Sequence, residues 1–153
     1  MTQARPRPRD PRPLRRVWHS VRNGLVWGVA AAAFSVVFTG LAGLAGIPLE
    51  VVPTDSVGPV SLGPLALIAA TLFAAALAGL ATGILGRLVR RPIPWIIASG
   101  VVITLASLSA PLNPSDPMPV STRVILVICH CVTGALVTYG LARGMVSDDR
   151  SAI

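Results

Sequence analysis

Four long apolar stretches, separated by short polar segments, dominate the hydrophobic pattern of this chain. They run over about residues 24–47, 64–86, 93–110 and 122–142. None of them holds an acidic residue or a lysine, and only the last holds an arginine, in its first turn. About 20 apolar residues in an α-helix cross the roughly 30 Å hydrocarbon core of a bilayer. The pattern therefore predicts an all-α integral membrane protein, a four-transmembrane-helix bundle over residues 17–143.

The composition agrees with a membrane protein and argues against a nucleic-acid partner. Of the 153 residues, 53% are hydrophobic and 12% are charged, and the mean hydropathy is +0.72. Soluble domains have about 25% charged residues. The net charge of +7 comes entirely from arginines, but they interrupt apolar runs instead of covering one face. We therefore expect no nucleic acid to bind.

The arginines fall on alternate polar segments. Seven precede the first apolar stretch and three occupy residues 87–91. The charged residues of the segments 48–63 and 111–121, by contrast, are all acidic. Arginine-rich short loops stay in the cytoplasm, which predicts a cell-membrane protein with both termini cytoplasmic. Trp18, Trp27, Trp95 and Tyr139 fall at the same predicted level, where amphipathic rings favour headgroups. The arginines expected at the lipid headgroups are Arg15, Arg16, Arg22, Arg87, Arg90 and Arg91.

Two terminal segments flank the predicted bundle. Arginine alternates with proline over much of residues 1–16, which predicts an extended or disordered cytoplasmic tail. Residues 144–153 form a second predicted cytoplasmic tail. The first tail either binds anionic lipid, at about 1 kcal/mol per arginine near the surface, or serves only to set the topology. The apolar run after it is longer than the core of a cleaved signal, so we expect it to be retained.

Small residues recur at four-residue spacing in the predicted helices. The first has Gly24 and Gly28, and the second has Gly79 and Gly83. Helices in lipid gain little from hydrophobicity when they associate, so they depend on close contact through small side chains. We expect these four glycines to lie in helix contacts.

The two predicted outer loops read alike. "PLEVVPTDSVGPVS" and "PLNPSDPMPVS" both contain Pro-Leu, then Pro-Thr/Ser-Asp, then Pro-Val-Ser. One explanation is a duplicated helical hairpin, with two copies related by an axis along the membrane normal, as in some transporters. The other is the chance likeness of proline-rich loops.

The triplet Cys129-His130-Cys131 lies in the middle of the last apolar stretch. Consecutive residues of a helix point about 100° apart, so the three side chains cannot converge on one metal ion, and the two cysteines cannot form a disulfide. We therefore predict no metal and no cofactor here.

His130 is the more informative residue of the triplet. It lies ten residues from the outer end of its predicted span, about 15 Å deep, and close to the membrane midplane. Thr39, Thr71 and Ser99 fall at the same depth, with Thr104 slightly outside. A polar residue at this depth is either functional or a neutral histidine hydrogen-bonded to a hydroxyl of another helix. These five residues form a candidate midplane polar site.

Three features resemble a known family: the arginine-rich start, "SLSAPL" at residues 107–112, and the histidine within "VILVICHCVTGALV" at residues 124–137. Together they resemble a family of small four-helix actinobacterial membrane proteins described only as a domain of unknown function. That family often has Met before the histidine, where this chain has Cys129. The resemblance implies a compact four-helix membrane fold and no particular activity.

We expect a non-enzymatic interaction or membrane-organising module, because no nucleophile–base pair or metal-ligand set is visible. Its partners would be anionic lipid headgroups and either further copies of itself or another membrane protein. The alternative is a permease for a small solute or an ion, working as a homo-oligomer with His130 and the hydroxyl layer along its path.

The alternation of arginines makes a prediction about topology. Reporter domains fused at Arg5 and Ser151 should be active in the cytoplasm, whereas fusions at Asp55 and Asp116 should be active only outside. An active cytoplasmic reporter at Asp55 would overturn the predicted topology.

Overall fold

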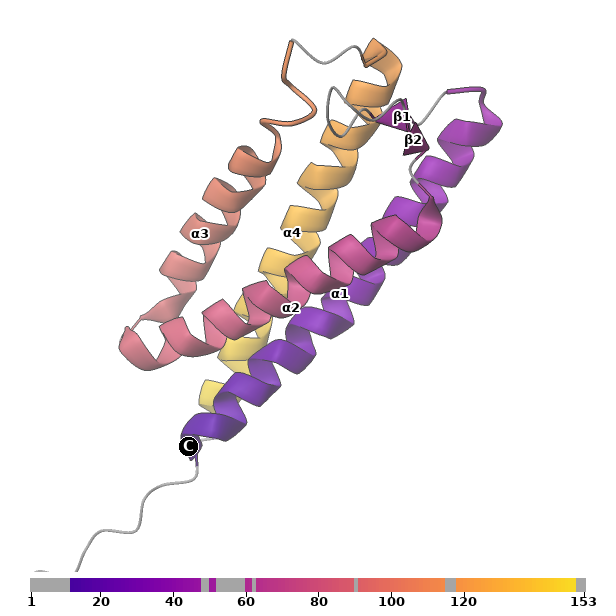
Figure 1. The fold of residues 1–153 in the computed structure, drawn as a ribbon. Coiled ribbons are helices and arrows are strands. Elements are labelled where there is room, and N and C mark those ends of the chain that lie inside the picture. Colours follow the sequence, from indigo (N-terminus) through magenta and orange to yellow (C-terminus); the bar gives the residue numbers. More distant parts are fainter. Residues whose placement is uncertain are drawn as a thin grey trace, which may run out of the picture.

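The computed structural model describes residues 12–47, 50–51, 60–61, 63–89, 91–114 and 118–150, with side chains over 17–47, 63–89, 91–114 and 118–146. Four helices follow one another: α1 (Arg12–Leu44), α2 (Pro64–Leu88), α3 (Pro92–Ser107) and α4 (Val120–Arg150) (Figure 1). The prediction of four helices is confirmed. Arg5, Asp55, Asp116, Ser151 and the side chains of Arg15, Arg16 and Arg90 lie outside the described residues.

The helices differ in whether they can cross a membrane. α1, α2 and α4 are each long and apolar enough to do so, which suggests a membrane protein. α3 has 16 residues, about 24 Å of helix, which is short of the 30 Å core. The prediction that this helix continues to residue 110 is therefore wrong, since α3 ends at Ser107. Residues 108–112 form turns, because Pro111 lacks an amide hydrogen and disfavours a helical conformation for Ala110.

The two terminal boundaries also differ from the prediction. α1 begins at Arg12 and α4 continues to Arg150, so residues 12–16 and 144–150, predicted as tails, are helical. α2 and α3 begin where predicted, each with proline in its first turn, where a missing amide hydrogen leaves no hydrogen bond unmade.

A small sheet lies between the C-terminal end of α1 and the N-terminal end of α2. Strands β1 (Glu50–Val51) and β2 (Val60–Ser61) pair antiparallel, with Glu50 opposite Ser61 and Val51 opposite Val60. The sequence pattern gave no sign of it, since the strands are only two residues long. The pairing brings the two ends of the α1–α2 loop together.

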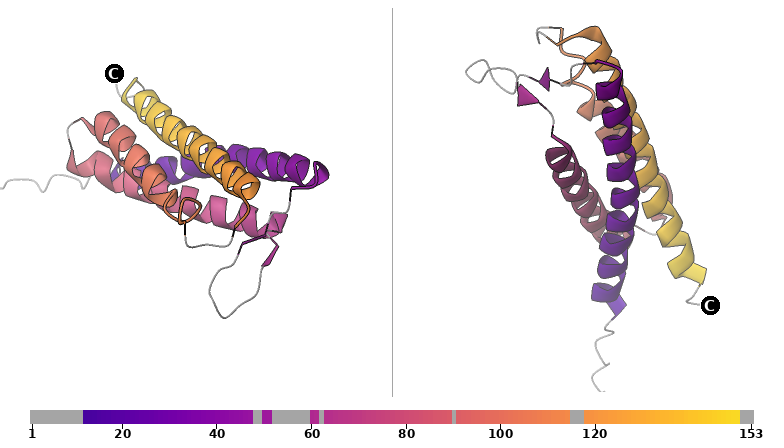
Figure 2. Two further views of the ribbon diagram at one scale, coloured as in Figure 1. Left: turned by 90° about the horizontal axis from the view of Figure 1, so that it is seen from above. Right: turned by 90° about the vertical axis from the view of Figure 1, so that its right-hand side faces the viewer.

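The helices pack around α1 and α4. α1 contacts α2 most extensively and α4 next, while α3 packs mainly on α4 and touches α2 little. Figure 2 shows α1 and α4 running alongside each other, with α3 against α4. One buried cluster, Ala31, Ala75, Ile96, Val137 and Leu141, takes a residue from every helix.

Small residues set the distance between α1 and α2. A Cβ atom added at Gly24 would lie 2.6 Å from the carbonyl oxygen of Ala75, and one at Gly79 would lie 2.8 Å from that of Ser20. At Gly83 it would lie 2.9 Å from the Cα atom of Val17. Such distances leave no room for a side chain, so the two backbones are in direct contact. Gly28 faces the Ala75 side chain in the same row.

α3 and α4 make a second contact, which we call the Gly/Thr seam. Gly100 of α3 faces Thr138 of α4, and Gly134 of α4 faces Thr104 of α3. Each helix thus offers a glycine and, four residues later, a threonine that fills the space at the other helix's glycine. This reciprocal pattern was not predicted from the sequence.

The outer surface of the four helices is apolar. Large side chains such as Leu65, Phe73, Val102 and Ile103 are more than 60% exposed. Contiguous apolar surface on every helix is unusual for a protein surrounded by water. It suits a surface that faces hydrocarbon.

The close α1–α2 contact allows a prediction about stability. Gly83→Leu should lower the free energy of unfolding by about 1–3 kcal/mol, because its side chain must push the Val17 backbone away. Gly43→Leu is the matched control, since nothing lies within 4 Å of a Cβ there. Thermal melting in detergent checks both variants, and equal melting would show that the contact is not close.

Candidate functional site

A cavity of about 600 Å³ lies between α2, α3 and α4. We call it the α2–α3–α4 cavity. α2 and α3 diverge from their connection, and α4 lies behind the space between them (Figure 1). Along α2 the cavity extends from Leu67 to Leu85, which is 18 residue steps or about 27 Å. Its α2 wall is largely alanine (Ala70, Ala74, Ala78 and Ala81).

The structure brings four of the five predicted polar residues together in this cavity. Thr71 of α2, Ser99 and Thr104 of α3, and His130 of α4 all line it. Thr39 does not line it. Its buried hydroxyl donates to the carbonyl oxygen of Ser35, 2.7 Å away, on its own helix.

His130 differs from the prediction in its hydrogen bond. It is half-buried, and its Nδ1 atom lies 2.7 Å from the carbonyl oxygen of Leu126, one turn earlier in α4. The expected hydrogen bond to Thr39, Thr71 or Ser99 is therefore wrong. Because a carbonyl oxygen only accepts, Nδ1 carries the hydrogen, and in the neutral ring Nε2 is an acceptor.

The hydroxyls of α3 are satisfied within α3. Ser99 donates to the carbonyl of Ile96, Thr104 to that of Gly100, and Ser107 to that of Thr104. Serine and threonine commonly return to the preceding turn in this way. Their hydrogens are therefore not available to an occupant of the cavity.

The hydroxyls of α2 behave differently. Thr71 and Thr82 line the cavity, and neither forms a hydrogen bond with the described residues. No buried polar side-chain atom in the described part of the chain lacks a partner. The two hydroxyls are therefore accessible from the cavity and not sealed within the protein.

Sequence reasoning missed an interhelical hydroxyl pair. The Ser35 hydroxyl of α1 lies 3.3 Å from the Thr133 hydroxyl of α4, and both residues line the cavity. A signal for Thr133 was present, because residues at i, i+3, i+4 and i+7 share a helix face. Counted from Leu126, this face holds Cys129, His130 and Thr133.

The two cysteines lie on different sides of α4. Cys129 is buried and lines the α2–α3–α4 cavity beside Ser35, whereas Cys131 is exposed. Both thiols are free, in agreement with the prediction that they cannot form a disulfide.

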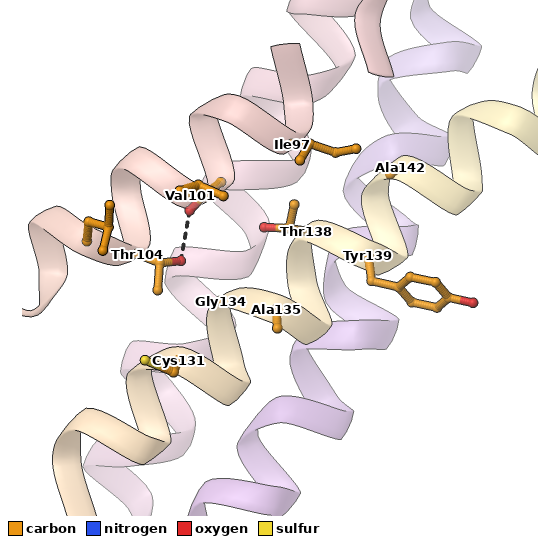
Figure 3. Close-up of a pocket in the computed structure, with 11 residues that line it drawn as sticks. Ile97, Val101, Thr104, Cys131, Gly134, Ala135, Thr138, Tyr139 and Ala142 are labelled. Atoms are coloured by element: carbon orange, nitrogen blue, oxygen red, sulfur yellow. Dashed lines mark hydrogen bonds between the residues drawn. The ribbon is translucent and has the colours of Figure 1, made fainter. Parts of the chain in front are cut away.

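A second pocket of about 420 Å³ lies on the other side of the Gly/Thr seam. Figure 3 shows Cys131, Ala135 and Tyr139 of α4 along it, opposite Val101 of α3. Gly100, Thr104, Gly134 and Thr138 line both this pocket and the α2–α3–α4 cavity. The seam is therefore a thin wall between two spaces.

Arginines lie at both ends of the helices. Arg22, Arg87, Arg91 and Arg143 are exposed, and their segments lie at the end of the molecule where α1 begins and α4 ends (Figure 1). Arg123 lies at the other end, where it donates to the carbonyls of Met118 and Asn113. This arginine braces the proline-rich α3–α4 loop, whose prolines cannot donate hydrogen bonds of their own.

These features define a small helical protein with three membrane-compatible helices and a cavity lined mainly by α2, α3 and α4. The chain belongs to the family of unknown function DUF6069, whose profile matches residues 14–147. The resemblance to a domain of unknown function is thereby confirmed. No curated protein and no solved structure matches the chain.

The position of His130 allows a prediction about the stability of two variants. His130→Leu should change the free energy of unfolding by less than about 1 kcal/mol, because the Leu126 carbonyl still accepts the backbone amide of residue 130. His130→Asp should cost about 3 kcal/mol in a membrane, the typical penalty for a central acid. Melting of the two variants in lipid nanodiscs checks this. A large loss in His130→Leu would show that the imidazole has a further partner.

Proposed function

We propose that this chain is a four-span integral membrane protein that acts as a non-enzymatic interaction module. Both termini lie in the cytoplasm, and the module binds its partner or ligand within the membrane. α3 completes the fourth span with the turns of residues 108–112. Duplication of a hairpin is compatible with the two antiparallel pairs, α1–α2 and α3–α4.

The observation that carries this proposal is the α2–α3–α4 cavity. It extends over about 27 Å of α2, close to the thickness of a hydrocarbon core. Among the described residues that line it, His130 is the one ionisable side chain besides Cys129, and acids and arginines are absent. Nucleophilic attack by a hydroxyl needs a base within hydrogen-bonding reach of it, whereas His130 bonds to the Leu126 carbonyl. A single imidazole among hydroxyls suits binding better.

A permease is the second candidate. The observation in its favour is that His130, Thr71, Ser99 and Thr104 line one cavity. A path for a solute would have to be closed by further copies of the chain, because the cavity is partly open to the outside. An aqueous path would also expose Cys129 to water-soluble reagents.

The arginines support the proposed orientation and a lipid partner. Arg22, Arg87, Arg91 and Arg143 are exposed near the ends of four different helices. Trp18 and Trp95 are also exposed near this level, and Trp27 packs edge-on against Tyr139, with 5.3 Å between ring centroids. Anionic headgroups fit a surface of arginines with interfacial aromatic rings.

Thiol accessibility separates the two candidates. In Cys131→Ser, which retains Cys129, a membrane-impermeant methanethiosulfonate should leave Cys129 unmodified if the cavity opens to lipid. Ser109→Cys, placed on the exposed outer turn, is the positive control in a background without the native cysteines. Rapid modification of Cys129 would favour the permease and contradict the interaction module.

A further inference from the structure

We propose that the α2–α3–α4 cavity binds an elongated, neutral, membrane-soluble molecule that donates a hydroxyl or amide hydrogen to Nε2 of His130. This proposal rests on the proposed function in one respect, the insertion of the chain in a membrane. It adds the chemical class of the ligand and the group that recognises it.

The size of the cavity is that of a small-molecule site. Ligand sites usually have volumes of about 300–1,000 Å³, and this cavity has about 600 Å³. It extends over about 27 Å of α2, and the α2 residues that line it are mostly alanines and leucines. This long apolar lining suits a hydrocarbon chain.

The hydrogen-bonding groups define the polar part of the ligand. His130 already donates through Nδ1 to Leu126, and its Nε2 has no hydrogen bond with the described residues. The α3 hydroxyls donate to their own helix. In hydrocarbon, Nε2 has no water to complete its bonding. A ligand that donates a hydrogen bond meets this need, and an ether or hydrocarbon does not.

The lining also excludes charged ligands. No arginine or acid lies among the described residues that line the cavity, so a carboxylate or a quaternary amine would lack a counter-ion in a medium where unpaired charge is costly. Thr71 and Thr82, which have no partner among the described residues, provide further sites for a second hydroxyl or a carbonyl. The ligand is therefore neutral and carries few polar groups.

The probes for the test are hexadecanol and its methyl ether, each with a diazirine in the chain. The full-length protein is photolabelled in phosphatidylcholine vesicles, and the labelled residues are mapped by mass spectrometry. Hexadecanol should label cavity-lining residues such as Ile103 about fivefold more than the ether does, the ratio expected from one hydrogen bond. His130→Leu should remove this preference.

Matched variants test whether the cavity itself is the site. Ala74 and Ala69 are both exposed on α2, but only Ala74 lines the cavity. Ala74→Leu should reduce cavity labelling severalfold, and Ala69→Leu should leave it unchanged. Ala81→Leu, at a second exposed lining position, provides the same test if Ala74→Leu does not fold.

The outcomes separate this inference from the proposed function. Resistance to alkaline extraction, measured on the same vesicles, reports insertion. An inserted protein that labels equally with both probes, or regardless of Ala74→Leu, overturns the ligand assignment alone. Crosslinking of the Ala74 region to another polypeptide, with no probe labelling, would identify a helix as the occupant and also overturn it. A protein extracted by alkali overturns both proposals.

Discussion

Direct contact between the α1 and α2 backbones is the constraint on which the rest of the arrangement depends. Gly24, Gly79 and Gly83 allow the two helices to touch without intervening side chains. This uses the small-residue face of α2 that contains Ala75 and the glycines. The adjoining face of α2, which looks toward α3, is also built of small residues. Because alanine side chains cannot fill the space to a diverging helix, the close contact on one side of α2 is accompanied by a cavity on the other.

The sequence predicted the elements better than their ends. Four apolar stretches were enough to predict four helices, because a run of that length has few other structures available to it. The end of α3 was misplaced because Leu108 to Leu112 are as apolar as the helix before them, and only Pro111 signals the change. The start of α1 and the end of α4 show the reverse, since polar residues that flank a span can still be helical.

The level of the candidate residues along their helices could be predicted from the sequence, but the side of the helix on which each lies could not. Counting residues from the helix ends placed Thr71, Ser99, Thr104 and His130 at similar levels, and all four line one cavity. Thr39 has the right depth but lies elsewhere, because a helix that is apolar all round gives no sign of its rotation. The partner of His130 was missed for a local reason. The carbonyl of Leu126, one turn earlier in the same helix, is within reach of the imidazole. Comparing the depths of residues in different helices cannot reveal a partner on the same helix.

α3 is the least extensively packed of the four helices, and α4 provides most of its contacts. It is joined to α2 by residues 89–91, packs on α4 through the Gly/Thr seam, and makes few contacts with α2. A larger side chain in the Gly/Thr seam would therefore separate α3 from the helix that provides most of its contacts, without entering the α1–α2 contact. The Arg123 bonds to the carbonyls of Met118 and Asn113 add an attachment at the loop that follows α3. Four small residues thus provide much of the attachment of a whole helix.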